Sequence, residues 1–352
     1  MGCTLSAKLF YICVPFVERY PTGRITKLPN PLLSHKFDMR TVNQKWVCGG
    51  RCNWSSLQEG SQPAVGDKFD MIRLMKSEEV RKLVAWAGEE GWNPGVHDAQ
   101  YFWNLDPEGF LAITENDEFM GGGAIIRHGG DFGFMGLFIV DKAHRGKGLG
   151  TKLWFARRDR LLSRLDGAGT IGLDGVDAMV PFYEKGGFTP FTRHRRFQLT
   201  TSVAKLIRSQ EIVDLSSISL PNLVDYDCQC FPVRRERFLR DWTTQQDAVS
   251  LALRKDEKLL GYGVMRPCLI GWKIGPMFAD SLEVADALFH SFQLAGRGTP
   301  IFLDVPDNNP QSLTLCKMHK MQEVFGCVRM YYGAVPQLDH SRIFGITTLE
   351  VG

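Results

Sequence analysis

The chain has 352 residues, of which 44% are hydrophobic and 23% are charged. These proportions are ordinary for globular proteins, so they exclude a disordered, collagenous or coiled-coil protein, and the length predicts about two domains. The net charge of +3 comes from 42 basic and 39 acidic residues, and this near balance argues against a dedicated nucleic-acid-binding protein. The nine cysteines are irregularly spaced and too few for a disulfide scaffold, which predicts free thiols in a cytoplasmic protein.

Residues 1–68 differ from the rest of the chain. Pro and Gly recur in them, no helical or strand period persists, and the first 57 residues carry an excess of basic side chains. We therefore expect an irregular, basic N-terminal extension. Its first six residues fit an N-myristoylation pattern at Gly2, and Cys3 could be palmitoylated, which would attach the chain to a membrane. The acid-poor composition also fits a mitochondrial presequence, so that location is the alternative.

From residue 69 onward, hydrophobic periodicity predicts one order of elements that occurs twice. In the first half we predict strands and helices over residues 70–75, 77–90, 98–105, 110–114, 119–127, 132–140, 149–165, 170–173, 178–185 and 188–199. After two weak helical stretches at 220–228 and 234–241, the second half repeats the order over 248–254, 259–267, 272–278, 282–295, 301–305, 309–319 and 324–332. This repetition predicts a diverged internal duplication, with one domain at 69–200 and another at 201–352.

A glycine-rich turn follows the apolar strand predicted at 132–140. The segment Arg145–Gly150 reads Arg-Gly-Lys-Gly-Leu-Gly and opens a helix. Its glycines let the main chain approach a ligand closely, while the free N–H groups and the dipole of the first helical turn attract an anion. The spacing is neither that of a mononucleotide P-loop nor that of a dinucleotide fingerprint. We interpret the turn as a pyrophosphate cradle; a tight strand–helix connection is the alternative.

A second motif, Phe182-Tyr183-Glu184-Lys185-Gly186-Gly187-Phe188, follows further along the chain. In this order, the two motifs resemble those of the Gcn5-related N-acetyltransferase (GNAT) superfamily over residues 69–199. Arg145–Gly150 matches the acetyl-coenzyme A motif of that superfamily, and Tyr183 matches its C-terminal motif. The second half resembles the acetyltransferase-like C-terminal domain of tandem acetyltransferases, through the segments 275–280, 303–306 and 344–350.

The resemblance implies an α/β fold with a mixed, mostly antiparallel central sheet of the acyl-CoA N-acyltransferase type, duplicated in the two halves. It also implies direct transfer of an acetyl group from acetyl-CoA to a primary amine of a small molecule or amino acid-like acceptor, in a ternary complex and without a metal. The implied acetyl-CoA site consists of the strand residues Leu137, Phe138, Ile139 and Val140 and the turn residues Arg145, Gly146, Lys147, Gly148, Leu149 and Gly150.

Catalytic residues are harder to assign. Tyr183 is the candidate acid that protonates the leaving thiolate, with a tyrosine that only packs on the core as the alternative. The strand at 132–140 contains no carboxylate, so we consider Asp174, at the end of the next strand, as a base; a helix-capping or turn residue is equally compatible. Trp92, Asn93 and Asp98 are candidate acceptor contacts in the region that lines the acceptor site in the superfamily, and a core indole and a capping aspartate are the alternatives.

The second half lacks the glycine-rich turn, because Ala279-Asp280-Ser281 joins its strand and helix, and Cys316 or a neighbour stands where Tyr183 would be. We interpret this half as catalytically silent and as closing one side of the acceptor cleft. Two other functions are compatible with the sequence: a non-catalytic acyl-CoA-binding regulatory module, and a membrane-tethered interaction protein.

Overall fold

The computed structural model describes residues 71–200, 209–296 and 298–352. The basic extension, with the acylation pattern at Gly2 and Cys3, lies outside these residues. The described residues belong to one compact unit. No helix in the described ranges is long and apolar enough to cross a membrane.

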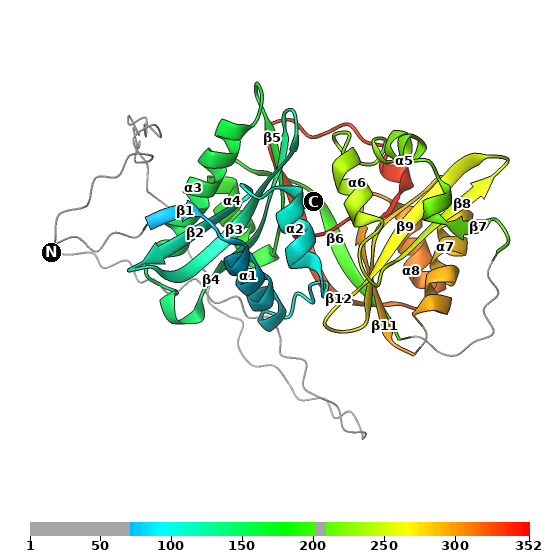
Figure 1. Cartoon of the computed structure of the whole chain (residues 1–352), viewed down its shortest axis with the longest axis horizontal. Coiled ribbons are helices and arrows are strands. Elements are labelled where there is room, and N and C mark those ends of the chain that lie inside the picture. The colour runs from blue at the N-terminus through cyan, green and yellow to red at the C-terminus, as the bar shows by residue number, and fades with distance from the viewer. Residues whose placement is uncertain (1–70, 201–208, 297) are drawn as a thin grey trace, which may run out of the picture. The chain divides into compact units, whose positions relative to one another are not determined.

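All elements predicted for the first half form (Figure 1). They are β1 (Met71–Leu74), α1 (Ser77–Glu89), α2 (Asp98–Leu105), β2 (Phe110–Glu115), β3 (Glu118–Gly129), β4 (Phe132–Val140), α3 (Leu149–Arg164), β5 (Thr170–Gly175), α4 (Val180–Lys185) and β6 (Thr189–Thr200). The start of α1 illustrates the local cause: the Glu79 carboxylate accepts a hydrogen bond from the Lys76 amide at 2.8 Å. This bond satisfies an amide that the helix itself leaves without a partner.

The second half contains every predicted element and two strands that were not predicted. Its elements are β7 (Ile212–Asp214), α5 (Leu220–Asp227), α6 (Glu236–Trp242), β8 (Val249–Lys255), β9 (Lys258–Pro267), β10 (Trp272–Ala279), α7 (Leu282–Ala295), β11 (Pro300–Pro306), α8 (Pro310–Met318), β12 (Gln322–Tyr332) and β13 (Ile343–Gly345). The unpredicted strands, β7 and β13, have three residues each. Alternation of apolar and polar residues cannot show in so short a run.

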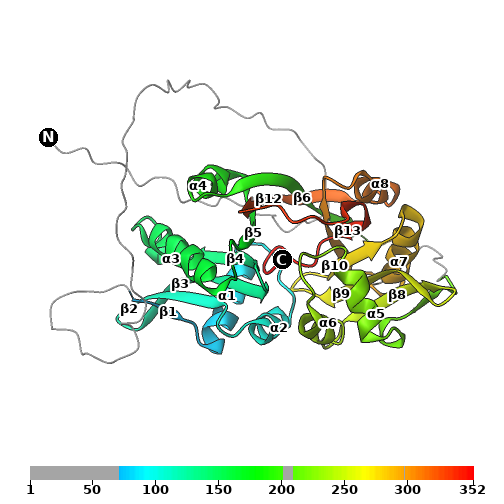
Figure 2. The ribbon, with the colours of Figure 1, turned by 90° about the horizontal axis from the view of Figure 1, so that it is seen from above.

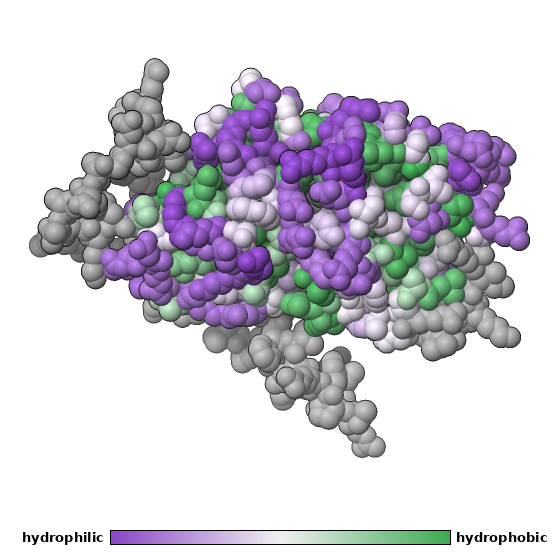
Figure 3. All heavy atoms as spheres, in the orientation of Figure 1, coloured by the Kyte–Doolittle hydropathy of each residue, from purple (hydrophilic) through white to green (hydrophobic). Residues whose placement is uncertain are grey.

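The strands form one 13-stranded sheet in the order β1-β2-β3-β4-β5-β12-β6-β11-β10-β9-β8-β7, with β13 paired to β10. The pairs β4–β5 and β10–β11 are parallel, and the other pairs are antiparallel. This confirms the mixed, mostly antiparallel and duplicated sheet. Buried side chains of α3 and α7 pack on the sheet of their own halves. Figure 3 shows that one face of the molecule is largely hydrophilic.

The two halves exchange their last long strands. β6 of the first half pairs with β11 of the second, from Thr200↔Pro300 to His194↔Pro306. In return, β12 of the second half pairs with β5 of the first, and β6 and β12 pair with each other in the middle of the sheet (Figure 2). The predicted domain boundary at residue 200 stays a prediction. In the structure, each half completes its part of the sheet with a strand from the other half.

The parallel strands separate at equivalent places in the two halves. The pairing of β4 with β5 ends at Met135↔Leu173, and the pairing of β10 with β11 ends at Ile274↔Leu303. Beyond that point β10 pairs with β13, at Met277↔Gly345. Among the described residues, no strand pairs with the corresponding stretch of β4, residues 136–140, on the side where β5 departs.

Candidate active site

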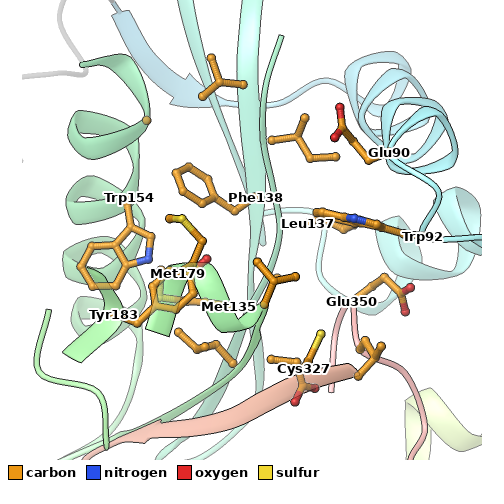
Figure 4. A pocket seen from close by; sticks show the side chains of 18 of the residues that line it. Glu90, Trp92, Met135, Leu137, Phe138, Trp154, Met179, Tyr183, Cys327 and Glu350 are labelled. Carbon is orange, nitrogen blue, oxygen red and sulfur yellow. The ribbon is translucent and has the colours of Figure 1, made fainter. Parts of the chain in front are cut away.

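A pocket opens where β4 and β5 separate, and it encloses about 1250 Å³ when its open mouth is included (Figure 4). The end of β4, the turn before α3, and α3 and α4 contribute one part of its wall. The second half contributes the other part. Its residues in the wall are Phe325, Cys327, Leu349 and Glu350. Both halves therefore build this site.

A backbone bulge shapes β4 at the pocket. Leu137 has a φ of +47°, a left-handed conformation that is costly for a residue with a Cβ atom. The register against β3 shifts at the same place, between Gly122 and Ala124. Arg157 of α3 fixes this geometry, because its Nη2 donates hydrogen bonds of 2.6 Å to the carbonyl oxygens of Ala124 and Gly136. Burial lowers the pKa of Arg157 to about 9.

The glycine-rich turn presents unpartnered amides to the pocket. Gly146 and Gly148 have φ values of +78° and +81°, which other residues adopt at a cost. No side chain caps α3 at Gly148. Within the described ranges, the amides of residues 146–150 donate no hydrogen bond to the protein. Gly146, Gly148 and Gly150 line the pocket, whereas the side chains of Lys147 and Leu149 do not.

Arg145 lines the pocket, and its guanidinium is bound by other groups of the protein. Its Nε donates to the Val140 carbonyl at 2.8 Å, and its Nη2 donates to the buried Glu90 carboxylate at 2.7 Å. The charge of this guanidinium is therefore balanced by the protein itself. Arg145 holds the turn against α1, and the amides of the turn remain the main feature that would attract an anion.

Tyr183 lies in the last turn of α4 and lines the pocket. Its ring stacks on Trp154, with centroids 5.9 Å apart. Burial raises its pKa to about 12, although the nearby Arg157 cation opposes this shift. The tyrosine thus packs on the core and also faces the pocket, and at neutral pH its hydroxyl is protonated and able to donate.

Asp174 lines the pocket, but its environment does not suit the role of a base. Its carboxylate accepts two hydrogen bonds from Arg329, at 3.0 and 2.7 Å, and His194 Nδ1 lies 2.9 Å from it. Burial alone would raise the pKa of Asp174, but these cationic partners outweigh burial and hold the pKa far below its ordinary value. A carboxylate held in this way has little affinity for a proton, which argues against a base at this position. The assignment of Asp174 stays a prediction.

Of the three predicted acceptor contacts, only Trp92 lines the pocket. Asn93 instead exchanges two hydrogen bonds with the main chain of Ile270, at 2.8 and 3.0 Å. Asp98 is completely buried against Arg266, at 2.8 Å. Burial would raise the pKa of Asp98, but Arg266 outweighs it and the pKa is lowered. Both side chains bind the second half of the chain, and their role as acceptor contacts stays a prediction.

Sequence reasoning missed several polar groups of the site: Glu90, Arg157 and Glu350. One of them had a signal, because Arg157 stands on the buried side of α3 with Leu153, Trp154 and Leu161, at helical spacing. An arginine in an apolar stripe indicates a buried polar contact. Glu350 belongs to the segment 344–350 that carried part of the resemblance, but we had assigned it no role.

Comparison with known proteins agrees with the fold, which is that of an acyltransferase of the GNAT type. Residues 77–188 match a family model described as the acetyltransferase (GNAT) family, and residues 223–345 match one described as an acetyltransferase (GNAT) domain. The chain therefore belongs to the GNAT acetyltransferases, as a tandem member with two such regions.

Relatives and a solved structure span nearly all of the described residues. The chain is 24% identical over 301 residues to the holothin acyltransferase of Pseudoalteromonas sp. (strain SANK 73390), covering 82% of this chain and 100% of the relative. It is 25% identical to the uncharacterized N-acetyltransferase YitH of Bacillus subtilis (strain 168), over 73% of this chain and 90% of the relative. A putative acetyltransferase from Pyrococcus horikoshii has a similar fold, with a TM-score of 0.70, 24% identity and coverage of 83% of this chain and 99% of that one.

Proposed function

We propose that the protein transfers an acetyl group from acetyl-CoA to a primary amine of a small molecule or amino acid-like acceptor, by direct attack in a ternary complex. One observation carries this proposal: the unpartnered amides of residues 146–150 border the same pocket as the unpaired edge of β4. Amides at a helix N-terminus suit a pyrophosphate, and an unpaired strand edge suits the amide groups of a pantetheine arm.

The residues of β4 would hold and polarise the donor. Among the described residues, no strand pairs with residues 136–140 on the side of the pocket. The carbonyl oxygens of Gly136 and Val140 already accept hydrogen bonds from Arg157 and Arg145, so the main-chain groups between them are the ones that can bind the pantetheine arm. The bulge at Leu137 redirects the main chain in the pocket that Tyr183 and Trp154 also line. Fixed N–H groups at such a place stabilise the negative charge that develops on a thioester oxygen.

The reaction needs two proton movements. The amine nitrogen forms a bond to the carbonyl carbon and gives up a proton to water in the pocket, while the carbon–sulfur bond breaks and the sulfur gains a proton. We assign the second step to Tyr183, whose pKa of about 12 keeps its hydroxyl protonated. A free thiol has a pKa of about 8.5, and burial in the same pocket raises it, which reduces the difference between the two groups.

Two measurements test this function. Calorimetric titration of the full chain with acetyl-CoA should give saturable binding, and a panel of primary amines should then release free thiol from acetyl-CoA. A chain that binds acetyl-CoA without releasing thiol for any amine would be a regulatory acyl-CoA-binding module. A chain that does not bind acetyl-CoA at all would contradict the proposal.

A further inference from the structure

The pocket contains a carboxylate oxygen that no protein group satisfies. Glu350 is 3% exposed and lines the pocket, and among the described residues its Oε2 is the one buried carboxylate oxygen without a hydrogen-bond partner. The indole Nε1 of Trp92, which lines the same pocket, is also buried and without a partner. Leaving buried polar atoms unsatisfied is costly, so such atoms in a pocket indicate the chemistry of a ligand.

The position of Glu350 is fixed by the fold. The Thr348 hydroxyl accepts hydrogen bonds from the amides of Glu350 and Val351, at 3.2 and 2.9 Å. The Glu350 carbonyl lies so close to Gly136 that a Cβ atom there would be 1.9 Å from it. Glu350 therefore adjoins β4 where this strand leaves β5. In Figure 4, Trp92 and Glu350 lie on the side of the pocket opposite Trp154 and Tyr183.

The surroundings of Glu350 are balanced in charge. Three buried cations face three buried carboxylates in the pairs Arg196–Asp304 at 2.7 Å, Arg266–Asp98 at 2.8 Å and Lys273–Glu350 at 3.7 Å. Arg157, also buried, has hydrogen bonds only to main-chain carbonyls and adds a positive charge to the pocket. An ammonium ion would leave a further unpaired positive charge in this place, whereas a neutral amine would not.

We infer that Glu350 and Trp92 form the acceptor subsite, and that this subsite binds a neutral, weakly basic amine whose molecule also carries a hydrogen-bond acceptor. The inference rests on the proposed function, since it names the acceptor of the same site. Glu350 Oε2 accepts a hydrogen bond from the amine, and Trp92 Nε1 donates one to the acceptor atom. Apolar walls from Leu137 and Phe138 suit an aromatic or other flat body between these two contacts.

Direct binding to the full chain tests the subsite without acetyl transfer. The probe is 4-aminobenzamide, a neutral aryl amine with a carbonyl acceptor. One comparison probe is 4-(aminomethyl)benzamide, whose amine is protonated at neutral pH as that of a lysine is. The other is benzamide, which lacks the amine. Calorimetry at neutral pH should show 4-aminobenzamide binding about tenfold more tightly than either comparison probe, the size expected from one satisfied buried group.

Variants assign this preference to the two side chains. Glu350→Met removes the carboxylate but keeps the length of the side chain, and it should weaken 4-aminobenzamide binding about tenfold while leaving acetyl-CoA affinity unchanged. Glu350→Gln keeps an acceptor oxygen and should therefore lose less affinity for 4-aminobenzamide. This variant replaces Glu350→Met in the test if the Met variant does not fold. Trp92→Phe should weaken binding of the amide-bearing probes. Glu283→Gln, on the exposed side of α7, is the matched control and should change nothing.

The outcomes separate this inference from the proposed function. Equal binding of 4-aminobenzamide by the wild type and the Glu350 variants would overturn the inference, as would equal binding of the ammonium probe or no binding of any probe. If the Glu350-dependent binding is found but acetyl-CoA does not bind, the acetyl-transfer function is wrong and the amine subsite stands.

Discussion

The two halves of the sheet separate their parallel strands at the same register, but they fill the opening differently. In the second half, β13 pairs with β10 just beyond the point of separation, and Phe344 of β13 is completely buried there. In the first half, the stretch of β4 after Met135 has no such strand and borders the pocket. The same strand geometry is thus filled by the folded interior in one half and borders an open pocket in the other.

The helix that follows each opening shows a second difference. Ser281 caps α7 by accepting a hydrogen bond from the Val284 amide at 3.4 Å. α3 begins at Gly148 without a side-chain cap. A cap uses a donor that an anion would otherwise bind. The comparison teaches that equivalent helix starts differ in whether the chain itself satisfies their amides.

The largest expected effect on the reaction rate concerns the acid. Replacing Tyr183 with Phe should lower kcat for acetyl transfer about 100-fold or more, the usual contribution of a positioned acid, while acetyl-CoA affinity stays nearly constant. Cys316→Ala, on the corresponding helix α8 of the second half, should leave kcat unchanged. Thiol-release kinetics with a substrate amine measure both variants. An unchanged kcat for the Tyr183 variant would remove it as the acid.

The next effect concerns the strand that fills the second half. Phe344→Ala deletes a buried ring from β13 and should destabilise the protein by about 3–5 kcal/mol. Urea unfolding measures this loss, and Phe138→Ala, in the open pocket of the first half, is the matched variant with a smaller loss. If both variants lost a similar free energy of unfolding, the two halves would not differ as described, with a filled opening between the parallel strands in the second half and an open one in the first.

A third prediction concerns the turn. Gly148→Val should weaken acetyl-CoA binding about 10- to 100-fold, because a β-branched residue at this positive φ costs about 1–3 kcal/mol and would redirect the amides. Ser281→Ala, the counterpart in the second half, should leave acetyl-CoA affinity unchanged. Titration calorimetry should also give one binding site per chain. A stoichiometry of two would mean that the second half binds as well.

The smallest effect links the end of the chain to pH. His128 lies 2.6 Å from the Val351 carbonyl through its Nε2, and burial lowers its pKa from 6.5 to about 3. Below pH 6.5 the unfolded chain therefore takes up a proton that the folded chain does not, so this residue makes stability fall on acidification. Between pH 7.5 and 5.5 the wild type should lose about 1.4 kcal/mol more than His128→Gln, measured by urea unfolding. Equal losses would show that His128 is not responsible.

The sequence predicted most of the fold because apolar spacing reports local structure. Helices α2 and α7 form over the residues predicted, since their buried positions recur at helical intervals. The glycine-rich turn could also be predicted, because the residues that define it are consecutive in the sequence. The ion pairs of Asp98 and Asp174 could not be predicted from the sequence. Their partners, Arg266 and Arg329, are distant from them in the chain. Charge pairing across such distances leaves no local pattern, and the same holds for Glu350.

The exchange of β6 and β12 has a consequence for how the molecule comes apart. Neither strand can leave the sheet without removing a central neighbour from the other half, because β6 pairs with β11 and β12 pairs with β5. Melting of one half therefore breaks hydrogen-bonded pairing in both. The duplicated fold is consequently expected to denature in a single cooperative step, and its two halves should not survive as separate fragments.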